Sequence, residues 1–176
     1  MFISDERYSN WQKQLTERIF FRRFWVFFGI YTVPVFFILG LYLLFVGQWK
    51  IVIAALAAFI LARLIISPLI FLFYKRQRPY QKLKFTSYHS RLFSAATLRF
   101  TSFPSDHAIS FASISGVCVY YHPHWGIVLI PLTLLNGIGR VVLGYHYVSD
   151  IIAGWLLGAL SAFAIIYWLC PRLFTH

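Results

Sequence analysis

Arginine, histidine and aspartate side chains recur in three short segments of an otherwise apolar sequence. The segments are Arg78-Pro79, Pro104-Ser105-Asp106-His107, and Arg140 followed by His146 and Asp150. The chain has five acidic residues, and Asp106 and Asp150 are the two beyond residue 17. Charged groups are costly inside membrane segments and therefore tend to be functional there. Two Arg, two His, a Ser and an Asp at the ends of apolar runs are typical of a site that handles phosphate.

Arg78 and Arg140 have the chemistry of phosphate clamps, because a planar guanidinium donates to two phosphate oxygens at once. The apolar run that begins at His107 predicts a helix whose first N–H groups attract an anion, and Ser105 adds a hydroxyl donor. These residues predict an anion site.

His146 is the better candidate for a nucleophile, since Asp150 lies four residues on and could hold the other ring nitrogen. His107 would then protonate the leaving oxygen. The reaction class is hydrolysis of a phosphomonoester or a pyrophosphate through a phosphohistidine. A metal-dependent phosphatase would need several clustered carboxylates, so the sequence predicts neither a metal nor another cofactor.

Composition places these segments in an integral membrane protein. The chain has 176 residues, of which 60% are hydrophobic and 12% charged. A helix needs about 20 apolar residues to cross a bilayer. We predict a single all-α membrane domain, residues 1–176, with about five spans. They are Trp25–Val46, Ile51–Tyr74 with a bend at Pro68, His107–Tyr121, Trp125–Leu143 and Val148–Leu169.

Consecutive spans alternate in direction, and this brings the three segments to one face of the bundle. Two spans also carry small residues at every fourth position, which allows close approach of two helices in lipid. These residues are Ala108, Ala112 and Gly116 in one span, and Gly154, Gly158 and Ala162 in the other. We expect the two spans to pack together. A homodimer contact through Gly154 and Gly158 is the alternative.

Two further segments complete the predicted organisation. Residues 4–23 combine apolar positions at helical spacing with basic residues, which favours a helix in the membrane interface over a frayed tail. Residues 80–103 mix basic and aromatic residues. They predict either an active-site lid that attracts a polyanionic headgroup or a surface loop with aromatic anchors.

Other polar residues favour simpler interpretations. Arg63 could line a polar cavity or pair with a polar group. It lies about 22 Å from Arg78 along a continuous helix, so we do not expect it to contact the phosphate directly. His122 and His124 flank Pro123 on the opposite face, where exposed turn residues are a better interpretation than a metal site. No basic module stands apart from the spans, so the basic balance indicates anionic lipid rather than nucleic acid as a partner.

The three segments resemble the signatures of the type-2 phosphatidic acid phosphatase superfamily of membrane lipid phosphatases. The resemblance covers residues 71–150. It implies that Arg78 and Arg140 bind phosphate with help from Ser105. It also implies that His107 is the acid and that Asp150 orients the nucleophile His146.

Two positions depart from the family pattern. Phe71 stands where the family usually has Lys, and Gly139 where it usually has Ser. Lys75 or another loop cation could supply the missing charge. Asp106 stands where many members have Gly. It could titrate, pair with an Arg or cap a helix, and we favour capping because Asp suits a helix start.

The Pro-Ser-Asp-His run without the lysine is similar to the bacterial branch that hydrolyses undecaprenyl diphosphate, the carrier lipid of peptidoglycan synthesis in cell wall biogenesis. Phosphatidylglycerophosphate, phosphatidic acid and lipid A are alternative substrates. A phosphotransferase on the same site and a non-enzymatic transporter or scaffold that binds lipid headgroups are alternative functions.

Two observations give opposite predictions for the side of the inner membrane that the active site faces. All but three of the 16 Lys and Arg lie on the motif-bearing face, the exceptions being Lys50, Arg63 and Arg172. The positive-inside rule places that face in the cytoplasm, whereas the family branch implies an outward-facing site. Because several of these cations would bind substrate or anionic lipid, we favour the outer face.

Overall fold

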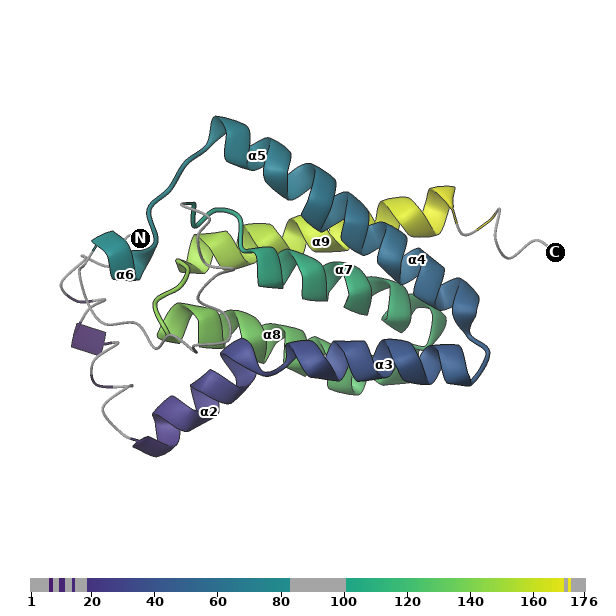
Figure 1. Ribbon diagram of the computed structural model, residues 1–176, viewed down its shortest axis with the longest axis horizontal. Coiled ribbons are helices and arrows are strands. Elements are labelled where there is room, and N and C mark those ends of the chain that lie inside the picture. Colours follow the sequence, from purple (N-terminus) through teal and green to yellow (C-terminus); the bar gives the residue numbers. More distant parts are fainter. Residues whose placement is uncertain are drawn as a thin grey trace.

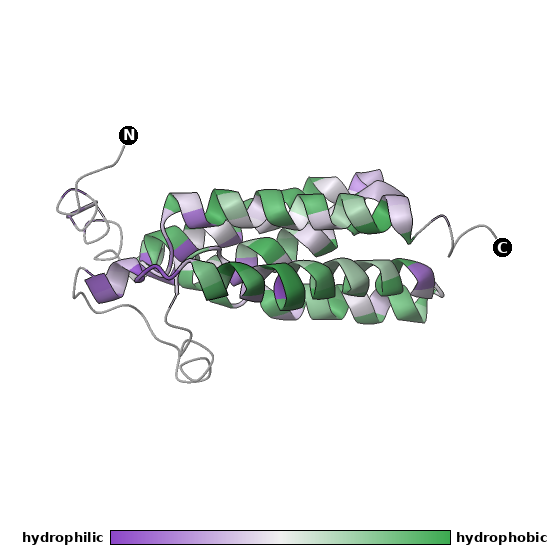
Figure 2. Cartoon of the chain, turned by 90° about the horizontal axis from the view of Figure 1, so that it is seen from above, coloured by the Kyte–Doolittle hydropathy of each residue, from purple (hydrophilic) through white to green (hydrophobic). Residues whose placement is uncertain are grey.

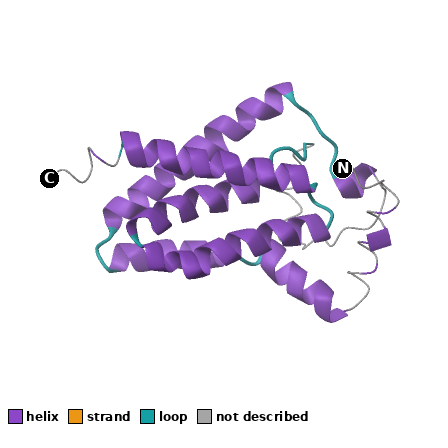
Figure 3. Ribbon diagram, turned by 180° about the vertical axis from the view of Figure 1, so that it is seen from behind, coloured by secondary structure: helices purple, strands orange, loops and turns teal. Residues whose placement is uncertain are grey.

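The computed structural model describes residues 19–82 and 101–169, with residues 7, 10, 11, 14 and 171 as isolated positions. The first part of the predicted interfacial helix, before Ile19, therefore lies largely outside the described residues. So does the middle of the predicted lid, residues 83–100. Helices and connecting loops make up the described ranges, in which no strand occurs (Figure 3).

Helices account for nearly all of the described chain. They are α2 Ile19–Ile30, α3 Val33–Phe45, α4 Trp49–Phe59, a π-helical segment Ile60–Ile66, α5 Ser67–Phe73, α6 Pro79–Lys82, α7 Asp106–Tyr121, a 3-10 turn Pro123–Trp125, α8 Gly126–Val142 and α9 Val148–Trp168. The helix α7 packs against α4, α8 and α9, while α2 packs against α8 (Figure 1). The predicted all-α bundle is confirmed.

Three of the predicted spans are long and apolar enough to cross a membrane: Trp49–Phe73, Pro123–Val142 and Val148–Trp168. The bent pair of α2 and α3 forms a fourth if it is counted as one span. The helix α7 has 16 residues and corresponds to the remaining predicted span. The long helices are mostly apolar, whereas α6 is hydrophilic (Figure 2). The protein is a multi-pass membrane protein.

The first predicted span, Trp25–Val46, is not a single straight helix. Its helical structure begins at Ile19, and the part from Phe20 bends by 43° between Ile30 and Val33. Pro34 lies in the first turn of α3 and lacks the N–H that would continue the α2 ladder. On α8, Asn136 Nδ2 donates to the Phe28 carbonyl and to Thr32 Oγ1, both at 2.8 Å. This side chain fixes the bend.

The second predicted span is continuous from Trp49 to Phe73, with the π-helical segment directly before Pro68. Pro68 has no N–H to donate to the helix ladder, and prolines and π-bulges are both recognised sites of helix distortion. The helix ends at Tyr74, whose backbone is extended, and the next residues lead back to α6 beside the bundle (Figure 1). A distance counted along a straight helix from Arg63 to Arg78 is therefore wrong.

The predicted packing of the two small-residue stripes is confirmed. A Cβ atom built on Gly154 would lie 2.8 Å from Ala108 Cβ, and one on Gly158 would lie 2.5 Å from the Ile109 carbonyl oxygen. Both glycines are buried against α7 within the chain. Within the chain, α7 covers the face of α9 that carries these glycines, and a homodimer stays a prediction.

Gly158→Ala should lower the stability of the folded protein in detergent by about 1–3 kcal/mol, the range for overpacking a close contact. The atom in its way is a backbone carbonyl, which cannot rotate aside as a side chain would. Gly40→Ala on α3 is the matched control, since a Cβ there has nothing within 4 Å. Thermal unfolding followed by Trp fluorescence measures both. Equal melting temperatures would contradict the packing argument.

Candidate active site

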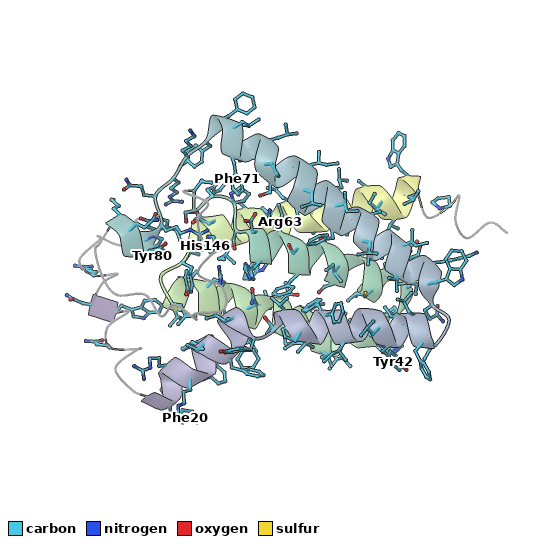
Figure 4. The ribbon with its side chains drawn as sticks, in the orientation of Figure 1. Phe20, Tyr42, Arg63, Phe71, Tyr80 and His146 are labelled. Atoms are coloured by element: carbon cyan, nitrogen blue, oxygen red, sulfur yellow. The ribbon has the colours of Figure 1, made fainter. Side chains whose placement is uncertain are left out.

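A cavity of about 600 Å³ lies at the end of the bundle where α7 and α9 begin and α8 ends. Its polar lining includes four residues that the sequence predicted for one site: Arg78, His107, Arg140 and His146. They come from the loop after α5, from α7, from α8 and from the α8–α9 connection. Three segments far apart in sequence thus meet at one cavity, near the labelled His146 (Figure 4).

A tight turn at the end of α8 brings His146 beside Arg140. The Tyr145 N–H donates to the Arg140 carbonyl at 3.0 Å and the Gly144 N–H to the Val141 carbonyl at 3.0 Å, the pattern of a Schellman motif. Gly144 has a φ of 76°, in the left-handed region that favours glycine. The spacing of Arg140 and His146 in the sequence therefore reflects one compact helix end.

The two predicted phosphate clamps are nearly buried, Arg78 at 5% and Arg140 at 6% exposure. Burial lowers the pKa of the Arg78 guanidinium from its ordinary value, although the group remains a cation at neutral pH. Arg78 Nε and Nη1 and Arg140 Nε are buried without a hydrogen-bond partner in the structure. A buried donor left unsatisfied costs about 1–3 kcal/mol. Such donors around a cavity could bind an anion.

His146 is held by a backbone carbonyl. Its Nδ1 lies 2.8 Å from the Ser102 carbonyl oxygen, and this oxygen can only accept, so Nδ1 carries the proton. The other ring nitrogen, Nε2, is then unprotonated, as a nucleophile requires. Burial lowers the pKa of His146 to about 4; the Asp150 carboxylate partly offsets this effect, and Arg140 and Arg78 add to it. The imidazole is neutral at pH 7.

Asp150 does not make the direct hydrogen bond to His146 that the sequence predicted. Its Oδ2 lies 3.8 Å from His146 Nδ1, beyond hydrogen-bond range. The buried carboxylate accepts instead from Arg76 Nη1 at 2.7 Å, from the Tyr147 N–H at 2.9 Å and from Ser102 Oγ. Asp150 therefore positions His146 through Ser102, whose hydroxyl binds the carboxylate and whose carbonyl binds the imidazole.

Arg76 is the main residue that the sequence analysis missed. Its guanidinium pairs with Asp150, donates to Ser149 Oγ at 2.8 Å, and lies 3.8 Å from the centre of the Tyr147 ring. The Ser102 N–H donates to the Arg76 carbonyl at 2.7 Å. The only signal in the sequence is the basic run before Arg78. Lys75, predicted as the auxiliary cation, is exposed and is not among the residues that line the cavity.

The start of α7 carries the second motif. Ser105 is the N-cap residue; its N–H donates to the Asp150 carbonyl at 3.1 Å, and its hydroxyl is buried without a partner. Ser105 itself is not among the cavity-lining residues of the described chain. Asp106 accepts from Arg63 Nη2 at 2.9 Å and from Ser67 Oγ at 2.8 Å. Of the roles left open for Asp106, the structure shows the pair with an Arg.

The rest of the cavity is apolar and follows the bundle away from the polar end. Its walls come from α3 and α4, with Phe111 and Ile114 of α7 between them. The α3 residues reach from Val33 to Leu44, about 16 Å along a helix. Several wall residues, such as Phe37 at 68% exposure, also face outward, where a membrane protein meets lipid. A polar headgroup site thus continues into an apolar groove.

Within residues 19–82 and 101–169, no three His, Cys, Asp or Glu side chains gather as a metal site would require. His122 and His124 lie at the other end of α7, and their rings pack beside that of Trp125. The charged side chains that line the cavity are three arginines and one aspartate. Such a set suits an anion.

Comparison with known proteins gives the family. Residues 49–173 match the PAP2 superfamily. The chain belongs to this superfamily. All three motif segments lie inside the matched range, together with α4 through α9.

Two relatives are similar to part of this chain. The bacitracin transport permease protein BcrC of Bacillus licheniformis is 43% identical over 76 residues, which are 43% of this chain and 37% of the relative. A lipid A 1-phosphatase of Rhizobium etli is 34% identical over 77 residues, 43% of this chain and 33% of the relative. The matches thus cover about a third of each relative's length. No solved structure matches the chain.

Arg76→Ala should destabilise this PAP2 protein by about 3 kcal/mol, the lower end of the range for removing one partner of a buried ion pair. The Arg76 side chain is 24% exposed, whereas Asp150 is fully buried and would keep an uncompensated charge. Lys75→Ala, at the exposed neighbouring position, should change the melting temperature little. A melting temperature unaffected by Arg76→Ala would show that Asp150 does not depend on this pair.

Proposed function

We propose that the protein hydrolyses a lipid phosphate or diphosphate without a metal, through a phosphohistidine on His146. The observation that carries the proposal is that a neutral His146 and two cationic side chains line the same cavity. A neutral imidazole, protonated on Nδ1 by its bond to Ser102, lines a cavity with two buried guanidinium groups whose donors are unsatisfied. A nucleophile beside an anion clamp is what phosphoryl transfer requires.

The proposed reaction has two steps. Nε2 of His146 attacks phosphorus while Arg78 and Arg140 bind the equatorial oxygens, and the bond to the leaving oxygen breaks. His107, in the first turn of α7, gives its proton to that oxygen. Water then gives a proton to His107 and attacks the phosphorus atom, the bond between phosphorus and Nε2 breaks, and inorganic phosphate leaves with both histidines restored.

The proposed substrate is undecaprenyl diphosphate, which would yield undecaprenyl phosphate and phosphate. Two observations support this choice. The Pro-Ser-Asp-His run and Phe71 resemble the branch that acts on this lipid. The groove between α3 and α4 offers an apolar surface for a long chain.

We further propose that the site faces the outer side of the inner membrane. The positive-inside rule counts cations that face water next to the spans. Arg76 is bound to Asp150, and Arg78 and Arg140 line the cavity, so these three residues belong to the site rather than to the loops. Their removal from the count weakens the argument for a cytoplasmic site.

His146→Gln should abolish phosphate release from undecaprenyl diphosphate in detergent, measured in the presence of a chelator. Glutamine keeps a polar side chain of similar reach but has no nucleophilic nitrogen. His122→Gln, at the opposite end of α7, is the matched control and should keep full activity. Activity that requires a divalent metal would reject the mechanism. Transfer of phosphate to a lipid acceptor without free phosphate would show a phosphotransferase instead.

The acid limb of kcat/KM should lie near pH 4 rather than near 6.5, because kcat/KM reports the free enzyme and the pKa of His146 is lowered to about 4 there. Protonation of Nε2 removes the attacking lone pair, so the rate falls as the pH drops through this value. A bound phosphate stabilises the imidazolium, and the limb of kcat should therefore lie at higher pH. Size-exclusion chromatography at pH 4.5 checks that the protein remains folded.

A further inference from the structure

Arg63 is a third arginine of the cavity, and none of the three motif segments contains it. It lies in the π-helical segment Ile60–Ile66 and lines the cavity together with Arg78 and Arg140. Figure 4 shows it at the beginning of α7, on the same side of the bundle as His146. Arg63 and Arg78 can line the same cavity because the chain turns after Tyr74 and brings Arg78 back to the bundle.

The Arg63 guanidinium is held in place by fixed partners. Its Nη2 donates to Asp106 Oδ2 at 2.9 Å, and Ser67 Oγ, on the following turn, donates to Asp106 Oδ1 at 2.8 Å. The carboxylate itself lies in the first turn of α7, where the helix dipole favours a negative charge. The Arg63 side chain keeps 20% exposure in this pair and lines the cavity, so a ligand in the cavity can reach it.

Arg63 also marks the boundary between the polar and apolar parts of the cavity. Phe59, one turn before it, lines the cavity, as do Leu56 and Val52 further along α4. Beyond Arg63 toward the other end of the molecule, the α4 lining is therefore apolar. Consider a lipid with its reacting phosphate between Arg78 and Arg140 and its tail in the groove. The part of the lipid that connects this phosphate to the tail would lie beside Arg63.

We infer that Arg63 binds the inner phosphate of a lipid diphosphate while His146 attacks the terminal phosphate. Arg63 is then a specificity-determining residue that favours lipid diphosphates over lipid monophosphates, and Asp106 and Ser67 are its positioning residues. This inference rests on the proposed function. It also assigns the cation that compensates for Phe71, since Lys75 does not line the cavity.

The charges of the cavity agree with a diphosphate. Arg63, Arg78 and Arg140 contribute three positive charges and Asp106 one negative charge, while His146 is neutral. A single phosphate would be matched by the two motif arginines. Asp106 offsets one of the three positive charges, and the three guanidinium groups together offer donors to two neighbouring phosphate groups.

The test compares a polyprenyl diphosphate with the monophosphate of the same tail. Arg63→Gln should lower kcat/KM for the diphosphate ~10–100-fold, the effect of losing a hydrogen bond to a charged group, mainly through KM. The monophosphate should change less than ~3-fold by the same reasoning. Lys50→Gln, a cation at the other end of α4, is the control and should leave both substrates unchanged.

The double variant Arg63→Gln, Asp106→Asn guards against misfolding, because it removes both charges of the pair and leaves no unpaired carboxylate. It should show the same loss of preference for the diphosphate. Equal losses on both substrates, or an unchanged ratio, would overturn the assignment of Arg63. A wild-type protein that releases phosphate from neither lipid would instead reject the proposed function itself, so the two failures are distinguishable.

Discussion

The hydrogen bond between His146 Nδ1 and the Ser102 carbonyl is the contact on which the site depends. It joins the segment before α7 to the turn between α8 and α9, and it fixes which imidazole nitrogen is free. The Schellman turn at Gly144 places the ring, and the bond from the Ser102 N–H to the Arg76 carbonyl places the acceptor. Close packing of α7 on the glycines of α9 brings these parts within reach.

Within residues 19–82 and 101–169, the two acidic residues are bound to arginines outside the three motifs. Asp106 pairs with Arg63, and Asp150 pairs with Arg76. In the sequence each aspartate stands close to a histidine, which suggests Asp–His pairs. A guanidinium competes better for a buried carboxylate, because it is always charged and donates through several N–H groups. His146 is consequently left to a backbone partner, the Ser102 carbonyl.

The sequence was sufficient for those features that follow from periodicity and alternation. Apolar runs of span length alternate in direction, so the ends that carry Arg78, His107 and Arg140 coincide, and stripes such as Gly154 and Gly158 require a close neighbour. The pairing of Arg76 with Asp150 could not be predicted, because it depends on how the chain folds back after Tyr74. Counting residues along a helix misplaced Arg63 for the same reason.

The ion pairs of Asp106 and Asp150 also determine which arginines remain available to a ligand. Had Asp106 or Asp150 paired with Arg78 or Arg140, a phosphate would have to displace a buried carboxylate, and the displaced charge would carry a large desolvation cost. Arg76 and Arg63 prevent this, since each holds one carboxylate away from the clamps. The unsatisfied donors of Arg78 and Arg140 are therefore preorganised for an anion, and their desolvation is already accounted for in the folded state. Two arginines thus neutralise the carboxylates, and the other two keep their donors directed at the cavity. This separation of roles keeps the cavity cationic inside an apolar bundle.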